Sequence, residues 1–85
     1  MAVRIRLARF GRRNHPIYRI VVMDSRRPRE GKYIDIIGTY DPKRHELIKF
    51  DEEKYLKWVS LGAEVTERAK AIYKLYKKLT AKQNA

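Results

Sequence analysis

The side chains best suited to chemistry in this sequence are arginines, and they are concentrated near the amino terminus. In the stretch VRIRL at residues 3–7, Arg4 and Arg6 alternate with apolar side chains. All nine cationic side chains among the first 29 residues are arginine, and none is lysine. A guanidinium can donate two parallel hydrogen bonds to one phosphate and can stack on a base, whereas lysine carries a flexible point charge. The preference for arginine therefore indicates phosphate recognition rather than solubility alone.

The net charge favours the same chemistry. The 85 residues include 21 Lys and Arg against 10 Asp and Glu, which gives a formal charge of +11. Residues 1–32 contain ten basic and two acidic side chains, so this part carries +8 of the total. Because such a charge repels itself in a compact domain, a polyanionic partner is expected, and nucleic acid is the commonest one for a small basic domain.

An enzymatic function would have to use the two histidines, His15 and His45. His45 is close in sequence to Asp41, Glu46 and Asp51, a composition compatible with a metal-dependent nuclease. The spacing of these residues matches no known ligand motif, and the sequence has no Ser-His-Asp order, glycine-rich phosphate loop or zinc pattern. We therefore expect no catalytic activity, cofactor, metal site or small-molecule substrate. His15 is expected to hydrogen-bond a phosphate or a ribose instead.

Length and composition limit the class of protein further. A chain of 85 residues is expected to form one domain over 1–85. The absence of cysteine excludes a disulfide scaffold. The longest aliphatic run, IVVM at residues 20–23, is much shorter than a membrane span or a signal-peptide core. The sequence therefore predicts a cytoplasmic protein with no membrane partner.

Apolar periodicity predicts strands in the first half of the chain. Val3, Ile5 and Leu7 fall on one side of a strand, and residues 11–16 are predicted to be a loop because Gly11 and Pro16 interrupt the pattern. Residues 17–23 form a second strand that is apolar on nearly both faces, which indicates a central position in the sheet.

A third strand is predicted over residues 33–40, with Ile34, Ile36, Gly38 and Tyr40 on one face. A glycine inside a strand is typical of a bulge or of a close backbone approach. Residues 24–32 and 41–44 are predicted to be loops, and residues 47–50 a short fourth strand.

The second half of the chain predicts two helices. Asp51 is a suitable N-cap for a helix that ends before Gly62, and Thr66 is suitable for a second helix with apolar residues on one side and lysines on another. Residues 81–85 are expected to fray. Strands followed by helices indicate an α+β fold, with a small four- to five-stranded sheet, mostly antiparallel or mixed, and two helices packed against it.

Several segments together resemble the S-sixteen family of bacterial small-subunit ribosomal proteins. VRIRLARFGR at residues 3–12 is similar to the family signature, PIYRIVVMDSRRPREGKYID and IGTYDP to its next two blocks, and WVSLGAEVTERA to its helix-turn-helix ending. The resemblance covers residues 2 to about 75. It implies an α+β domain, monomeric in isolation, that helps the 5′ domain of small-subunit ribosomal RNA to fold during assembly, beside neighbouring small-subunit ribosomal proteins.

The resemblance also implies which residues contact RNA. These are Arg4, Arg6, Arg9, Phe10, Gly11, Arg12, Arg13, Asn14, His15, Arg26, Arg27, Arg29, Lys32, Lys43 and Arg44. No role transfers to residues 74–85, because this end varies across the family. Phosphate contacts of this kind give affinity and register, and specificity would come from the shape of a folded RNA junction.

Other interpretations of the same features remain open. Charge on an exposed strand often serves only to prevent aggregation, although here the arginine face continues into two arginine-rich loops. Phe10 either stacks on an unpaired base or caps the core at the end of its strand. A DNA-binding protein could be equally basic, but the basic half of this chain is strand and loop and offers no obvious recognition helix.

Overall fold

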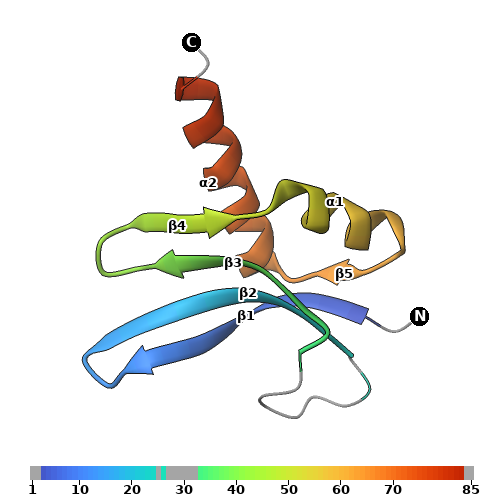
Figure 1. Ribbon diagram of the computed structural model, residues 1–85, viewed down its shortest axis with the longest axis horizontal. Coiled ribbons are helices and arrows are strands. Elements are labelled where there is room, and N and C mark those ends of the chain that lie inside the picture. The colour runs from blue at the N-terminus through green and yellow to red at the C-terminus, as the bar shows by residue number, and fades with distance from the viewer. Residues whose placement is uncertain (1–2, 25, 27–32, 84–85) are drawn as a thin grey trace.

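The fold is a five-stranded mixed sheet with two helices, as seen in a computed structural model that describes residues 3–24, 26 and 33–83 (Figure 1). The strands are β1 (Val3–Arg12), β2 (His15–Asp24), β3 (Asp35–Asp41), β4 (Glu46–Phe50) and β5 (Glu64–Val65), and the helices are α1 (Glu52–Ser60) and α2 (Glu67–Gln83). The strand order is β4-β3-β2-β1-β5, in which the first four strands are antiparallel to their neighbours and β5 is parallel to β1. The predicted α+β class is confirmed.

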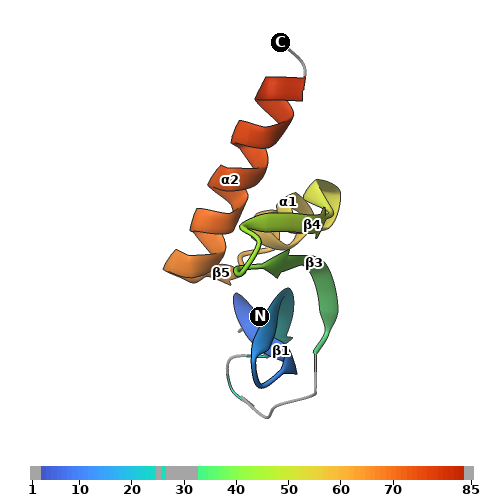
Figure 2. The same ribbon diagram turned by 90° about the vertical axis from the view of Figure 1, so that its left-hand side faces the viewer.

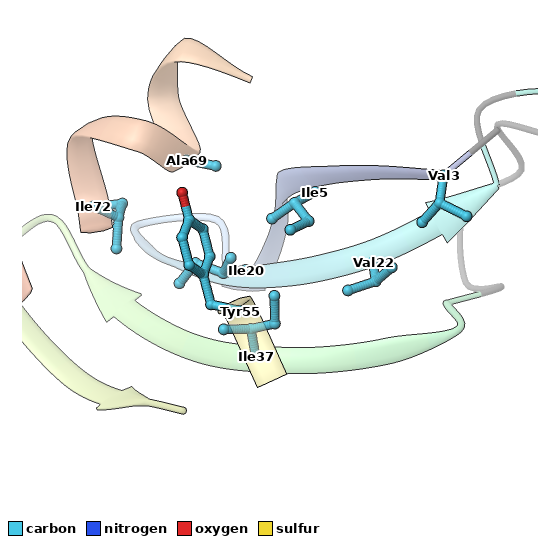
Figure 3. Close-up of a cluster of buried hydrophobic side chains, with 8 residues drawn as sticks. All are labelled: Val3, Ile5, Ile20, Val22, Ile37, Tyr55, Ala69 and Ile72. Carbon is cyan, nitrogen blue, oxygen red and sulfur yellow. The ribbon is translucent and has the colours of Figure 1, made fainter. Parts of the chain in front are cut away.

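Both helices cover the same face of the sheet. The buried cluster takes Val3, Ile5, Ile20, Val22 and Ile37 from the strands, Tyr55 from α1, and Ala69 and Ile72 from α2 (Figure 3). Alternation along β1 places Val3 and Ile5 in this cluster and leaves the Arg4 and Arg6 side chains exposed on the opposite, outer face. The outward direction predicted for these two arginines is therefore confirmed.

The central position predicted for the second strand is also confirmed. β2 lies in the middle of the five strands, and four consecutive residues on it, Ile20, Val21, Val22 and Met23, are buried. Val21 and Met23 pair with Arg6 and Arg4, so they lie on the outer face, beside the arginines on the neighbouring strand. Burial on both faces explains why this strand has no polar alternation over residues 20–23.

The faces predicted for the third strand are wrong. Ile37 is buried in the core, whereas Ile34 and Ile36 are exposed. The cause is an irregularity in the β2–β3 pairing, in which Val21 pairs with Ile36 and the next residue, Ile20, pairs with Gly38. The extra residue on β3 reverses the alternation. The bulge or close backbone approach expected at Gly38 is confirmed by this irregularity.

Most of the loop predicted over residues 11–16 is strand. β1 extends to Arg12 and β2 begins at His15, so the hairpin closes through only Arg13 and Asn14. Gly11 has φ +91°, and a Cβ at this position would lie 2.6 Å from the His15 carbonyl oxygen. Glycine at this position thus allows the strand to continue where any other side chain would obstruct it. The basic residues of the hairpin are consequently held on a rigid element.

The helix ends lie where the sequence predicts them. The Asp51 carboxylate accepts a hydrogen bond from the Lys54 backbone N–H at 3.2 Å, and Thr66 Oγ1 accepts one from the Ala69 N–H at 3.3 Å. Gly62 follows α1 at φ +94°. Although residues 81–85 are expected to fray, α2 includes residues 81–83.

Two carboxylates connect elements that are distant in sequence, and they predict a loss of stability in acid. The Glu52 carboxylate accepts from Lys77 Nζ at 2.7 Å and from the Tyr73 hydroxyl at 2.9 Å, and these bonds lower the pKa of Glu52. Burial alone would raise the pKa of Asp35, but hydrogen bonds from Lys54 and Trp58 outweigh burial and lower it.

A carboxyl whose pKa is lower in the folded than in the unfolded chain stabilises the fold above its unfolded pKa. The ordinary values are 4.5 for Glu52 and 3.8 for Asp35. We therefore expect the free energy of unfolding in urea to be steady near neutral pH and to fall progressively below pH 4.5. The loss should be smaller in a Glu52→Gln variant, which cannot titrate there. Equal losses in this variant and in the wild-type chain would show that Glu52 does not contribute to the effect.

Candidate nucleic-acid interface

Two hairpins end on the same side of the sheet (left in Figure 1, facing the viewer in Figure 2), and both carry basic residues. One is the β1–β2 hairpin and the other is the β3–β4 turn, and we call residues 11–15 and 41–45 the hairpin-tip surface. A cleft of about 640 Å³ lies between them, lined by Gly11, Arg12, Arg13, Asn14, His15, Ile17 and Lys43. Six of these seven residues are among those expected to contact RNA.

A buried carboxylate joins the two hairpins below this cleft. Asp41, at the end of β3, is only 3% exposed. Its Oδ2 accepts a hydrogen bond from His15 Nε2 at 2.9 Å, and its Oδ1 accepts from the backbone N–H groups of Lys43 at 3.0 Å and Arg44 at 3.3 Å. The bond from His15 lowers the pKa of Asp41 and outweighs the opposite effect of burial. The carboxylate is therefore ionised near neutral pH.

The cations of the hairpin-tip surface remain available for an external anion. Arg12, Arg13 and Lys43 are exposed, and in the part of the chain that the structure describes no carboxylate oxygen lies within 4.0 Å of their charged nitrogens. Arg44 Nε lies 4.0 Å from Asp41 Oδ2, with a side chain that is 71% exposed. An ion pair this long and this exposed contributes little, so Arg44 can exchange it for a phosphate.

The outer face of the sheet carries a second set of cations. Arg4 forms an ion pair with Glu64 at 3.2 Å, but both side chains are largely exposed, so the pair is weak. Arg6 follows two residues later on the same face. A smaller cleft of about 380 Å³ at the edge of β1 is lined by Arg4, Arg6, Leu7, Thr66, Glu67 and Arg68. Arg68 is not among the RNA contacts expected from the sequence, which predicts an apolar side and a lysine-rich side for this helix.

Arg9 and Phe10 differ from the other expected contacts. Arg9 pairs with Tyr18 in the register, which places it on the helix-covered side and not with Arg4 and Arg6. The Phe10 ring is half-buried on the outer face, where the Arg19 guanidinium lies 4.4 Å from its centroid and the Tyr33 ring contacts it edge to face at 5.8 Å. These contacts support packing rather than base stacking for Phe10.

In the arginine-rich segment that follows β2, residues 25–32, the structure describes only Arg26. Arg26 is exposed, and its backbone N–H donates to Asp24 Oδ1 at 2.9 Å. It follows the end of β2 that is opposite the hairpin tip, so it is remote from the cleft. The other expected contacts here, Arg27, Arg29 and Lys32, lie outside the described residues. The structure thus brings six expected residues together at one cleft and places Arg4, Arg6 and Arg26 elsewhere.

The nuclease alternative finds no support in the geometry. Within residues 3–24, 26 and 33–83, no three His, Asp or Glu side chains are arranged to hold a metal ion. His15 is engaged with Asp41, whereas His45 is exposed in the β3–β4 turn at φ 51°. None of the described helices is long and apolar enough to cross a membrane.

Comparison with known proteins points to one family. The sequence pattern of the family described as ribosomal protein S16 matches residues 9–66. The small ribosomal subunit protein bS16 of Aquifex aeolicus is 69% identical over 72 residues, which are 85% of this chain and 64% of that protein. The bS16 protein of Caldicellulosiruptor bescii is 56% identical over 75 residues, 87% of this chain and 93% of the relative.

The match extends to more distant relatives. The bS16 protein of Chlamydia muridarum is 43% identical over 90 aligned positions, which cover 100% of this chain and 78% of the relative. A match to the family pattern over more than half of the chain, together with these identities, is sufficient for assignment. The chain therefore belongs to the ribosomal protein S16 family, whose members are structural proteins of the small ribosomal subunit that act in translation and are not enzymes.

Proposed function

We propose that this protein binds the 5′ domain of small-subunit ribosomal RNA through the hairpin-tip surface and the outer-face arginines, and that it stabilises a folded RNA junction during assembly. The protein acts in the cytoplasm, as part of the ribosome. It would be a monomer before incorporation and would lie beside other small-subunit proteins, with no small-molecule substrate.

The observation that carries this proposal is the meeting of two basic hairpin ends around one cleft. Arg12 and Arg13 come from one hairpin, and Lys43 and Arg44 come from the other. Short, hydrogen-bonded turns fix the spacing of these cations before RNA arrives, so little conformational entropy is lost on binding. A preformed pattern of charges suits a target that is recognised by shape.

The outer face extends the same surface away from the cleft. Arg4 and Arg6 alternate along β1, and Arg68, at the start of α2, lines the same cleft. We propose that these side chains bind a second stretch of the RNA backbone. Contacts at two separate places on one rigid domain would hold two RNA segments at a fixed distance, as stabilisation of a junction requires.

The test is the salt dependence of binding. If roughly 6 to 10 phosphates are neutralised, the logarithm of the affinity for the 5′-domain RNA should fall with the logarithm of salt concentration at a slope of about −4 to −9. Duplex DNA of equal length should compete poorly, because it has the charge but not the folded shape. A slope near zero, or equal competition by the DNA, would contradict the proposal.

A further inference from the structure

We propose that Asp41, although negatively charged, is a positioning residue for RNA binding: through His15 and the β3–β4 turn it locks the two basic hairpin ends in one arrangement. This inference rests on the proposed function, because it concerns the geometry of the same surface. It also changes the expectation for His15, whose Nε2 bonds Asp41 instead of facing RNA.

The geometry gives one carboxylate three partners on two hairpins. Oδ2 accepts from the His15 ring, which begins β2 opposite Arg12, while Oδ1 accepts from the backbone of Lys43 and Arg44. Within the described residues, the bond from His15 to Asp41 is the only side-chain hydrogen bond that joins the two hairpin ends. Its loss would allow the two pairs of cations to move independently.

Because Asp41 is buried, its hydrogen bonds are not easily replaced. The Asp41 side chain is 5% exposed, so a carboxylate here cannot be solvated by water in place of its three donors. Hydrogen bonds to a buried charged group are the strong ones and are directional. An anion beneath a phosphate-binding surface also opposes RNA electrostatically, so its presence needs a compensating benefit, which positioning supplies.

Because the charge of Asp41 opposes RNA binding, charge and positioning predict opposite changes in RNA affinity when Asp41 is replaced. Replacing Asp41 raises the net charge by one, and if charge alone mattered, RNA affinity would increase. Positioning predicts the reverse. We expect Asp41→Ala to weaken binding of the 5′-domain RNA about tenfold, the affinity equivalent of one charge-assisted hydrogen bond.

His15 provides a second variant in case Asp41→Ala does not fold. The His15 side chain is 37% exposed, so substitution there is tolerated more easily. His15→Phe removes the donor and should also weaken binding about tenfold. His15→Gln retains an N–H donor and should restore most of the affinity. The Asp41→Ala/His15→Phe double variant should lose no more RNA affinity than whichever single variant binds RNA more weakly. The reason is that both changes break the same link.

Rescue by the conservative variant separates positioning from a merely structural role. Both His15→Phe and His15→Gln remove the imidazole, but only His15→Gln keeps a group that can donate to the Asp41 carboxylate. RNA affinity should therefore follow the presence of this donor, and not the thermal stability of the variant.

Asp35→Ala is the matched control. Asp35 is also a partly buried carboxylate with side-chain donors, Lys54 and Trp58, but it lies at the opposite end of β3. Its replacement makes the same charge change and costs stability, yet it should not weaken RNA binding. All affinities are measured by filter binding at a temperature where thermal unfolding shows each variant to be folded.

The outcomes distinguish the positioning role of Asp41 from the proposed function. Weaker binding by Asp41→Ala and His15→Phe, with rescue by His15→Gln, would support the link. The positioning role alone would be overturned by a different pair of results. The wild-type chain would bind the RNA with a steep salt slope, and the folded Asp41→Ala or His15→Phe variant would bind it equally or more tightly. Failure of the wild-type chain to bind the RNA would overturn the proposed function and the inference together.

Discussion

Replacing the four exposed cations of the hairpin-tip surface by glutamine is expected to weaken binding of the 5′-domain RNA by about 100- to 1,000-fold at physiological salt. The variant carries Arg12→Gln, Arg13→Gln, Lys43→Gln and Arg44→Gln. If each cation neutralises one phosphate, the slope of log affinity against log salt should also become shallower by about 3. Filter binding over a salt series measures both quantities.

The control removes the same number of charges from the helices. Its four lysines are exposed on α1 and α2: Lys57, Lys70, Lys74 and Lys78. Replacing them by glutamine lowers the net charge equally but leaves the cleft intact. We expect this control to lose less than about tenfold, mainly through long-range electrostatics. Equal losses in the two variants would mean that total charge, and not its position, determines binding.

Gly38→Val is expected to destabilise the fold by about 3 kcal/mol, at the upper end of the cost of over-packing. A Cβ at Gly38 would collide with the Lys49 carbonyl oxygen and would lie 3.1 Å from Phe50 Cα, both of them backbone atoms of β4. Strand propensity alone predicts the opposite sign, because valine favours strands and glycine does not. Urea denaturation at pH 7 measures the change, and a variant as stable as the wild-type chain would contradict the close approach of β3 and β4.

Gly62→Ala is the comparison for that experiment. Among the described residues, apart from its chain neighbours, no atom lies within 4 Å of a Cβ at Gly62, so its φ of +94° is what opposes a side chain there. The expected cost is about 1 kcal/mol, the strain of a positive φ for a residue with a Cβ. The larger loss in Gly38→Val would then be due to steric contact between strands.

The sequence was informative wherever one local pattern decides the structure. The alternation of Val3, Arg4 and Ile5 was enough to predict which side chains of β1 face the core, and the caps Asp51 and Thr66 marked both helix starts. The two buried faces of β2 indicated its central position correctly. In each of these cases local propensity and tertiary packing favour the same conformation.

The errors arose where pairing between strands decides the structure. The bulge beside Gly38 exchanges the faces of Ile36 and Ile37, and the spacing of β3 alone does not reveal which residue is extra. The hairpin at Gly11 was predicted as a loop because Gly11 and Pro16 usually end strands.

In the candidate site too, some features could be predicted from the sequence and others depend on pairing between strands. Its cations could be named from composition and from the family resemblance, because residue type alone marks them. The link from Asp41 to His15 joins residues 26 positions apart and exists only after the sheet has formed. The sequence predicted only a loop over residues 41–44, and nothing in it pointed to a partner for Asp41 on the other hairpin.

The most direct test of the central claim uses the absence of cysteine from the chain. A single cysteine introduced as Asn14→Cys, or as Lys74→Cys on α2, can carry a tethered iron chelate that cleaves nearby RNA by hydroxyl radicals. We predict strong, localised cleavage of the 5′-domain RNA from position 14, at the hairpin tip, and weak cleavage from position 74. Strong cleavage from position 74 with none from position 14 would show that RNA lies on the helices, and would contradict the proposed interface.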